Sequence, residues 1–243
     1  MPEIADDQKG RPALVSKPTR WLPMAIPALA ILLLLAVAVI TREGHDLPAS
    51  VPSGDVQAHI AVGSAALKQG NAVRAIQEFE AAVRLAPDSR DAHFLLGNTY
   101  LQHGELEKAA QAYQRVLQLE PRDVDAHANL GVVYYQMARL DEAIAEFEAG
   151  LAIRPDDASL HYLLGAAYLQ AGDLRNARKS FEQAKSLDPN LPEVYFGLGM
   201  LSKLEGRREE AIANFEHFLK IGPGQDPRAK DEAERELKEL KEQ

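Results

Sequence analysis

Residues 124–157 read VDAHANLGVVYYQMARLDEAIAEFEAGLAIRPDD, and this stretch is one copy of a pattern that recurs every 34 residues. Within it, Gly131 follows a leucine, Ala143 lies twelve residues further on, Phe147 follows, and Pro155 closes the copy. A fixed period of this size indicates one supersecondary unit repeated along a solenoid, so the repeat decides the fold before any single element is assigned.

The same residue types recur in register along the chain. Proline closes each copy, at Pro87, Pro121, Pro155, Pro189 and Pro223. Glycine lies at Gly63, Gly97, Gly131, Gly165 and Gly199. The alanines are Ala75, Ala109, Ala143, Ala177 and Ala211, and the aromatic residues are Phe79, Tyr113, Phe147, Phe181 and Phe215. Agreement across five copies makes chance similarity a poor explanation.

Each copy has the apolar spacing of two amphipathic helices. The first copy predicts helices over Val56–Gln69 and Val73–Ala86, joined by a polar turn that contains Gly70. The repeated glycine and alanine allow the two helices to approach closely, and the aromatic residue fills the space beside them. Proline cannot continue a helix, so it ends the second one. Stacked pairs would bury a continuous core that one pair cannot bury alone.

This order of leucine-glycine, alanine, aromatic residue and proline resembles the tetratricopeptide repeat. The resemblance implies an all-α, right-handed solenoid of helix-turn-helix repeats that acts in protein–protein interaction. The repeats predicted are 56–89, 90–123, 124–157, 158–191 and 192–225. They are followed by a charge-rich segment, 226–243, whose weak apolar stripe is typical of a helix that caps a solenoid.

An uncharged segment precedes the repeats. Trp21–Ile40 is long enough to cross a bilayer as a helix, which predicts one transmembrane helix between a polar tail (1–20) and a linker (41–55). The tail carries four basic residues and only Arg42 follows closely, so the positive-inside rule predicts a cytoplasmic tail with the repeats across the membrane.

The resemblance also implies which membrane Trp21–Ile40 would cross. Similarity to bacterial anchored repeat proteins of the envelope implies that this segment lies in the inner membrane, with the repeats on the periplasmic side. The alternative is a cleaved signal peptide with Ala36-Val37-Ala38 at the cleavage site, and the long apolar run favours the anchor.

Composition narrows the function. The net charge is −9 and there is no cysteine. An acidic chain is a poor partner for nucleic acid, and thiolate catalysis and cysteine-based metal sites are excluded. No phosphate-binding loop, HExxH or GxSxG motif occurs, so we expect no cofactor and no enzymatic activity.

Histidine recurs at one repeat position, as His59, His93, His127 and His161, and Tyr195 replaces it in the fifth copy. A metal array is one interpretation. Packing between helices is the stronger one, because helices about 8–10 Å apart keep neighbouring histidines too distant to share one ion easily. A histidine-based metal site or enzyme therefore stays the weakest alternative.

The resemblance implies a concave groove lined by the first helix of each repeat. Its candidate peptide-binding residues are Phe94, Asn98, Leu101, Asn129, Tyr135, Tyr162, Leu169 and Phe196. We expect these residues to form an apolar floor that is partly exposed, and such a stripe often marks a binding site. The opposing interpretation is that some of them pack against neighbouring helices.

Asn98 and Asn129 match the asparagine pair of chaperone-binding family members. The basic residues that complete the carboxylate clamp there are replaced here by Phe94, Ser159 and Leu163. The sequence therefore predicts a scaffold or assembly factor that binds the backbone of a peptide segment from another protein, not an acidic chain terminus. Self-association into a homo-oligomer is the alternative.

Overall fold

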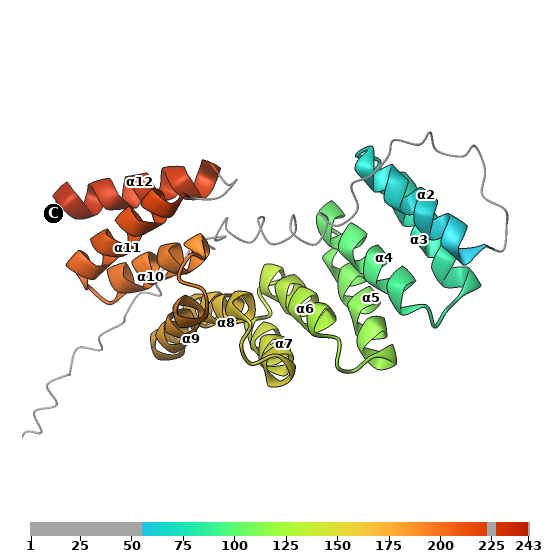
Figure 1. The fold of residues 1–243 in the computed structure, drawn as a ribbon, viewed down its shortest axis with the longest axis horizontal. Helices are drawn as coiled ribbons and strands as arrows, with labels where there is room; N and C mark the ends of the chain where they lie inside the picture. Colours follow the sequence, from blue (N-terminus) through green and yellow to red (C-terminus); the bar gives the residue numbers. More distant parts are fainter. Residues whose placement is uncertain (1–54, 223–226, 243) are drawn as a thin grey trace, which may run out of the picture.

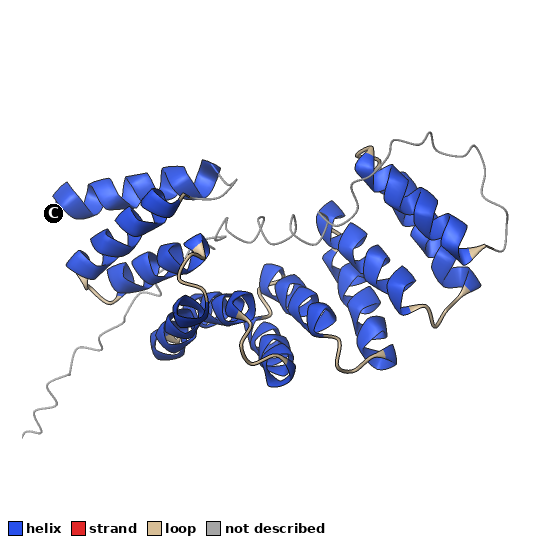
Figure 2. Cartoon of the chain, in the orientation of Figure 1, coloured by secondary structure: helices blue, strands red, loops and turns tan. Residues whose placement is uncertain are grey.

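The computed structural model describes residues 55–222 and 227–242, and all regular secondary structure in these residues is helical (Figure 2). The eleven helices are α2 (Val56–Lys68), α3 (Ala72–Leu85), α4 (Arg90–His103), α5 (Leu106–Leu119), α6 (Val124–Gln136), α7 (Leu140–Ile153), α8 (Ala158–Ala171), α9 (Leu174–Leu187), α10 (Pro192–Leu204), α11 (Arg208–Ile221) and α12 (Pro227–Glu242). The predicted all-α solenoid is confirmed for this part of the chain.

The helices pair in chain order and the pairs follow one another along an arc (Figure 1). Each helix of a pair packs most extensively against its partner, and the second helix of a pair then packs against the first helix of the next pair. In the middle of the arc, α6 and α8 lie on the hollow side, and α7 and α9 lie on the outer side. The first helices of the pairs therefore line the inner face of the arc.

The repeated proline follows the end of the second helix in each of the first four pairs. The residue before it is the helix C-cap, and Ala86, Glu120, Arg154 and Asp188 all have φ between −127° and −134° with ψ between 83° and 96°. Proline disfavours the helical region for the residue that precedes it, which explains this shared conformation. The helix boundaries thus follow directly from the 34-residue step.

The first helix of each of the first four pairs begins with a side-chain cap. Asp55, Ser89, Asp123 and Asp157 each accept hydrogen bonds from backbone N–H groups of the first turn. These bonds satisfy donors that have no partner within the helix. The fifth pair differs, since Leu191 is the N-cap of α10 and Pro192 begins the helix. The missing cap is offset in part because proline lacks one of those donors.

The glycine and the aromatic residue of each repeat are in contact inside the pair. A Cβ atom added to Gly131 would lie 2.5 Å from Cε1 of Phe147, and the other four glycines of this position are equally close to their aromatic partners. Phe79, Tyr113, Phe147, Phe181 and Phe215 are fully buried. The predicted close approach of the two helices is therefore confirmed, and it explains why glycine occupies this position in every copy.

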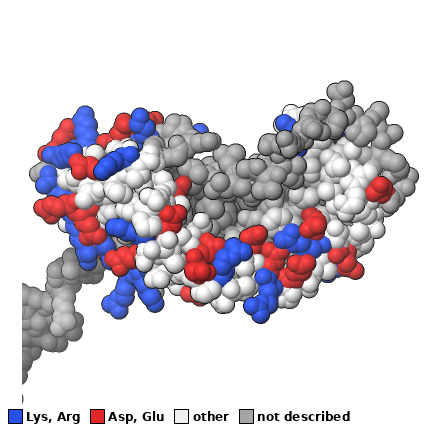
Figure 3. Space-filling model, viewed as in Figure 1, with Lys and Arg blue, Asp and Glu red and all other residues white. Residues whose placement is uncertain are grey.

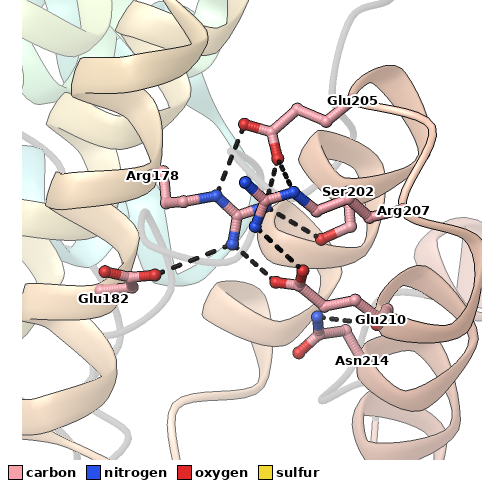
Figure 4. Close-up of polar contacts among 7 residues, drawn as sticks. All are labelled: Arg178, Glu182, Ser202, Glu205, Arg207, Glu210 and Asn214. Carbon is pink, nitrogen blue, oxygen red and sulfur yellow. Dashed lines mark hydrogen bonds and ion pairs between the residues drawn. The ribbon is translucent and has the colours of Figure 1, made fainter.

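The C-terminal end of the arc is held by charged contacts and by α12. Arg178 on α9 donates from Nη1 to Oε1 of Glu210 at 2.6 Å, and it also pairs with Glu205 and Ser202 of the next repeat (Figure 4). Helix α12 packs on α11 and buries Ala229, Ala233 and Leu240. Burial of one narrow apolar stripe leaves the rest of α12 in water, as expected of a terminal cap.

Acidic and basic side chains are intermixed on the surface. In the view of Figure 3 they cover the C-terminal end and the outer edge, without an extended area of one sign on that face. Among the helices of residues 55–222 and 227–242, none has the length and apolar character needed to cross a bilayer. The predicted transmembrane helix (21–40), its tail and its linker up to residue 54 lie outside the described residues.

Candidate interaction surface

The eight predicted groove residues all lie on the first helices of pairs two to five. Leu101, Tyr135, Tyr162, Leu169 and Phe196 are buried, and Phe94, Asn98 and Asn129 are partly exposed. The expected exposed apolar floor is therefore wrong for five of the eight residues.

Packing within the pair explains part of this burial. The ring of Tyr162 lies 6.0 Å from that of Phe181, and the ring of Phe196 lies 5.9 Å from that of Phe215. Phe94 makes an edge-to-face contact of 5.9 Å with Tyr113. These three residues share one repeat position, and at this position the aromatic ring packs on the second helix of its own pair. The sequence pattern did not predict this packing, because a residue at this helical position can face either the core of the pair or the groove.

Asn98 and Asn129 come together across two pairs. Nδ2 of Asn129, on α6, donates to Oδ1 of Asn98, on α4, at 3.2 Å. The hydroxyl of Tyr113, on α5, donates to the same oxygen at 2.5 Å. Burial raises the pKa of Tyr113, so its hydroxyl stays protonated and remains a donor. The side-chain carbonyl of Asn98 is thus held by two donors.

This arrangement leaves one donor group and one acceptor of the two side chains without a hydrogen bond among the described residues. Nδ2 of Asn98 and Oδ1 of Asn129 make no hydrogen bond to any residue within 55–222 or 227–242. An amide donor beside an amide acceptor matches the N–H and C=O groups of an extended peptide backbone.

The acidic residues at the starts of α4 and α6 have basic partners. Asp91, at the start of α4, accepts from Nη1 of Arg90 at 3.1 Å, and Asp125, at the start of α6, lies 3.8 Å from Nη1 of Arg154. Phe94 is in the place where a clamp would carry a cation. The surface is therefore better suited to a neutral backbone than to a free carboxylate.

A second group of polar atoms is buried on the inner face of the last three pairs. Among residues 55–222 and 227–242, no hydrogen-bond partner is found for four atoms: Tyr135 Oη, Tyr162 Oη, Gln170 Oε1 and Glu193 Oε2. Burial raises the pKa of the Tyr162 hydroxyl and of the Glu193 carboxyl, since a buried charge lacks solvation. Sequence reasoning missed this group, because only Tyr135 and Tyr162 were among the predicted residues and both were expected to be partly exposed.

Three of the in-register histidines tie their pair to the loop before it. Nε2 of His93, His127 and His161 lies 2.9–3.1 Å from the carbonyl oxygen of the preceding Pro87, Pro121 or Pro155. His59 and His127 also place Nδ1 within 2.8 Å of Glu78 and Glu146. No three His, Asp or Glu side chains of the described residues are grouped as metal ligands would be. The six-residue spacing from proline to histidine was the sequence signal for these bonds.

The family model described as "Cilia and flagella-associated protein 70 C-terminal domain", a model of tetratricopeptide repeats, matches residues 28–225. No curated protein sequence matches the chain.

Three solved structures illustrate the likeness. MamA from Desulfovibrio magneticus RS-1 is 23% identical with a TM-score of 0.65, and the match covers 72% of this chain and 99% of that one. PilF of Pseudomonas aeruginosa is 23% identical with a TM-score of 0.62, over 76% and 88%. YrrB, entitled "a TPR protein with an unusual peptide-binding site", is 18% identical with a TM-score of 0.59, over 72% and 90%. At these identities the likeness shows the fold alone.

Proposed function

Because the chain belongs to the tetratricopeptide-repeat family, we propose that it is a non-catalytic interaction scaffold that binds a segment of another protein on its inner face. The observation that carries this proposal is the Asn98–Asn129 pair, whose free amide nitrogen and free carbonyl oxygen match a peptide backbone. The resemblance of the fold to peptide-binding repeat proteins supports the class of ligand, and it identifies no partner.

The bound segment is extended and crosses from α4 to α6. Phe94 is partly exposed one helical turn before Asn98 and offers an apolar contact to one of its side chains. Each backbone hydrogen bond to the asparagines would contribute about 0.5–1.5 kcal/mol, and truncating an aromatic contact of this kind commonly costs more than ~2 kcal/mol.

Affinity capture from extracts of the source cells tests this function. Full-length wild type, Asn98→Ala/Asn129→Ala and Gln111→Ala/Gln118→Ala would be compared. The last variant removes two exposed amides from α5 and leaves the inner face intact. We expect the asparagine variant to lose its partners and the glutamine control to keep them. Equal capture by all three proteins, with helical content unchanged by circular dichroism, would contradict the proposal.

We also propose that Trp21–Ile40 anchors the scaffold to the inner membrane, with the repeats on the periplasmic side. The support is the uncharged run of bilayer length, preceded by Lys9, Arg11, Lys17 and Arg20. A periplasm-dependent reporter fused after Gln243 should be active, and the protein should resist carbonate extraction. An inactive reporter, or extraction of the full-length protein by carbonate, would contradict the anchor.

A further inference from the structure

The junction between the fourth and fifth pairs differs in chemistry from the three junctions before it. At each earlier junction, a tyrosine on the first helix of one pair shares a hydrogen bond of 2.6–2.8 Å with the second helix of the pair before it. These bonds join Tyr100 to Glu80, Tyr134 to Gln114 and Tyr168 to Glu148. Ser202 occupies the equivalent position of α10, so the fourth junction lacks the tyrosine ring.

A second replacement, Arg178 on α9, lies at the same junction. One, two and three repeats earlier its position holds an apolar residue: Ile144, Ala110 and Ile76. The two replaced positions meet in space, because Nη2 of Arg178 donates to Oγ of Ser202 at 3.3 Å. A polar contact has therefore taken the place of an apolar residue and a tyrosine.

The guanidinium of Arg178 is held by carboxylates from the fifth pair (Figure 4). It pairs with Glu205, the C-cap of α10, and donates from Nη1 to Oε1 of Glu210, on α11, at 2.6 Å. Arg207, in the turn between α10 and α11, pairs with the same two carboxylates at 3.2 and 3.3 Å. Several charges that share partners hold an interface better than an isolated ion pair does. We name Arg178, Ser202, Glu205, Arg207 and Glu210 the ionic latch.

The rest of this junction is packed less extensively than the others. Helices α9 and α10 make a smaller contact than α3 with α4, α5 with α6 or α7 with α8. One apolar contact here joins a ring to a bare backbone, since a Cβ atom added to Gly197 would lie 2.7 Å from Cζ of Phe181. Such a contact has no interlocking side chain, so it can serve as a pivot when the ionic latch opens.

Helix α12 belongs to the part beyond the ionic latch. Lys203, on α10, pairs with Glu236 and Glu239 of α12. Nε of Arg208, on α11, donates to the carbonyl oxygen of Leu240 at 2.6 Å. Because α12 is bonded to both helices of the fifth pair, we expect α10, α11 and α12 to move as one unit.

We propose that the ionic latch makes the junction between α9 and α10 a salt-sensitive hinge, about which α10–α12 turn relative to α2–α9. Close-packed apolar contacts favour one arrangement, whereas ion pairs between partly exposed side chains are screened by salt. Opening the ionic latch changes the curvature of the arc at its C-terminal end. The effect of that change on a bound segment rests on the proposed function, but the hinge itself does not.

Distances between spin labels test the hinge, and the natural chain contains no cysteine to interfere. In the full-length protein, purified in a non-ionic detergent, Ala145→Cys/Ala213→Cys labels equivalent exposed positions of α7 and α11, across the ionic latch. The matched control, Gln77→Cys/Ala145→Cys, labels the same position of α3 and α7, also two repeats apart. Double electron–electron resonance gives the distance distributions at about 0.1 M and about 1 M sodium chloride, where the Debye length is about 10 Å and about 3 Å.

At the higher salt we expect the distribution across the ionic latch to broaden at least about twofold, while the control distribution stays unchanged. Adding Arg178→Ile/Ser202→Tyr gives the fourth junction the residues of the third, and should keep the distribution narrow at both salt concentrations. Arg178→Gln, which disturbs packing less and serves if that variant does not fold, should broaden the distribution already at low salt.

Three results would overturn the hinge. The first is a distribution across the ionic latch that does not respond to salt in the otherwise wild-type protein. The second is an equal response of both label pairs, because the whole solenoid would then loosen in salt. The third is a variant, Arg178→Ile/Ser202→Tyr or Arg178→Gln, that behaves as the wild type does at both salt concentrations. None of these readouts uses a ligand, so a scaffold that captures no partner would contradict the proposed function and leave the hinge intact.

Discussion

The hydroxyl of Tyr195 donates to the carbonyl oxygen of Pro189 at 2.8 Å. Three earlier repeats make the equivalent bond with Nε2 of a histidine, to the carbonyl of the proline six residues before it. Imidazole and phenol are different groups, but each offers a ring that packs between helices and a donor at its far edge. The position is therefore defined by a hydrogen bond to the loop that joins two repeats.

Exchange at this position should be tolerated as long as the donor remains. We expect Tyr195→Phe to lower the free energy of unfolding by about 0.5–1.5 kcal/mol, the usual contribution of one hydrogen bond. Tyr195→His should restore most of that loss, since histidine makes the same bond in the preceding repeat. The measurement is urea-induced unfolding followed by circular dichroism. A Tyr195→Phe protein as stable as wild type would show that the bond contributes nothing.

The contact between Gly131 and Phe147 should dominate the stability of the third pair. Phe147→Ala should cost about 3–5 kcal/mol through the cavity it leaves, and Gly131→Ala about 1–3 kcal/mol because the new Cβ meets the ring. In the double variant Gly131→Ala/Phe147→Leu the clash is relieved, so the losses should not add. Urea midpoints of Gly131→Ala, Phe147→Leu and the double variant check this, and strict additivity would argue against the contact.

The turn between α6 and α7 is strained at one residue. Ala138 has φ of 57°, where the equivalent turns carry Gly70, Gly104, Gly172 and Gly206. A left-handed conformation costs a residue with a Cβ about 1–2 kcal/mol. Ala138→Gly should therefore stabilise the protein by about 1 kcal/mol, and Gly104→Ala should destabilise it similarly. Thermal unfolding of both variants would contradict this if the two midpoints moved in the same direction.

The repeat register made most of the architecture predictable. Gly131, Phe147 and Pro155 each have a steric consequence that acts locally, so helix pairs, turns and close contacts follow from the spacing alone. The resemblance to chaperone-binding repeats singled out Asn98 and Asn129, and the structure adds the hydrogen bond between them. The helix pairs, turns and close contacts depend on short-range geometry that every copy shares.

The solvent exposure of the inner-face side chains could not be predicted from the repeat spacing. Tyr162 and Phe196 lie at a position that a helical pattern allows to face either the groove or the second helix, and only the packed structure shows the ring on Phe181 or Phe215. Burial of Glu193 likewise depends on what surrounds it in space, which no 34-residue spacing encodes.

Glu193 should give stability a specific pH dependence. It lies in the first turn of α10, is 8% exposed, and burial raises its pKa. The folded protein therefore holds this proton more tightly than the unfolded chain. Stability from this group is fully present below the unfolded pKa of about 4.3 and is lost as pH rises through the higher folded pKa.

Glu193→Gln removes that loss. At pH 7 the variant should be more stable than wild type, and the difference should shrink as the pH falls toward 4. Glu107→Gln is the matched control, because Glu107 occupies the same turn of α5 but is exposed. Urea unfolding at several pH values checks the prediction. A variant less stable than wild type at pH 7 would show that the ionised carboxylate is stabilised where it lies.

The central claim is that the inner face carries the interaction. Photo-crosslinking in the source cells tests it most directly, with p-benzoylphenylalanine in place of Phe94 on α4 or, as the outer control, in place of Gln111 on α5. Phe94 is already aromatic and partly exposed, so the probe should disturb the fold little. We predict a covalent adduct with another protein from position 94 and none from position 111. An adduct from position 111 alone would place the interaction on the outer face and contradict the account.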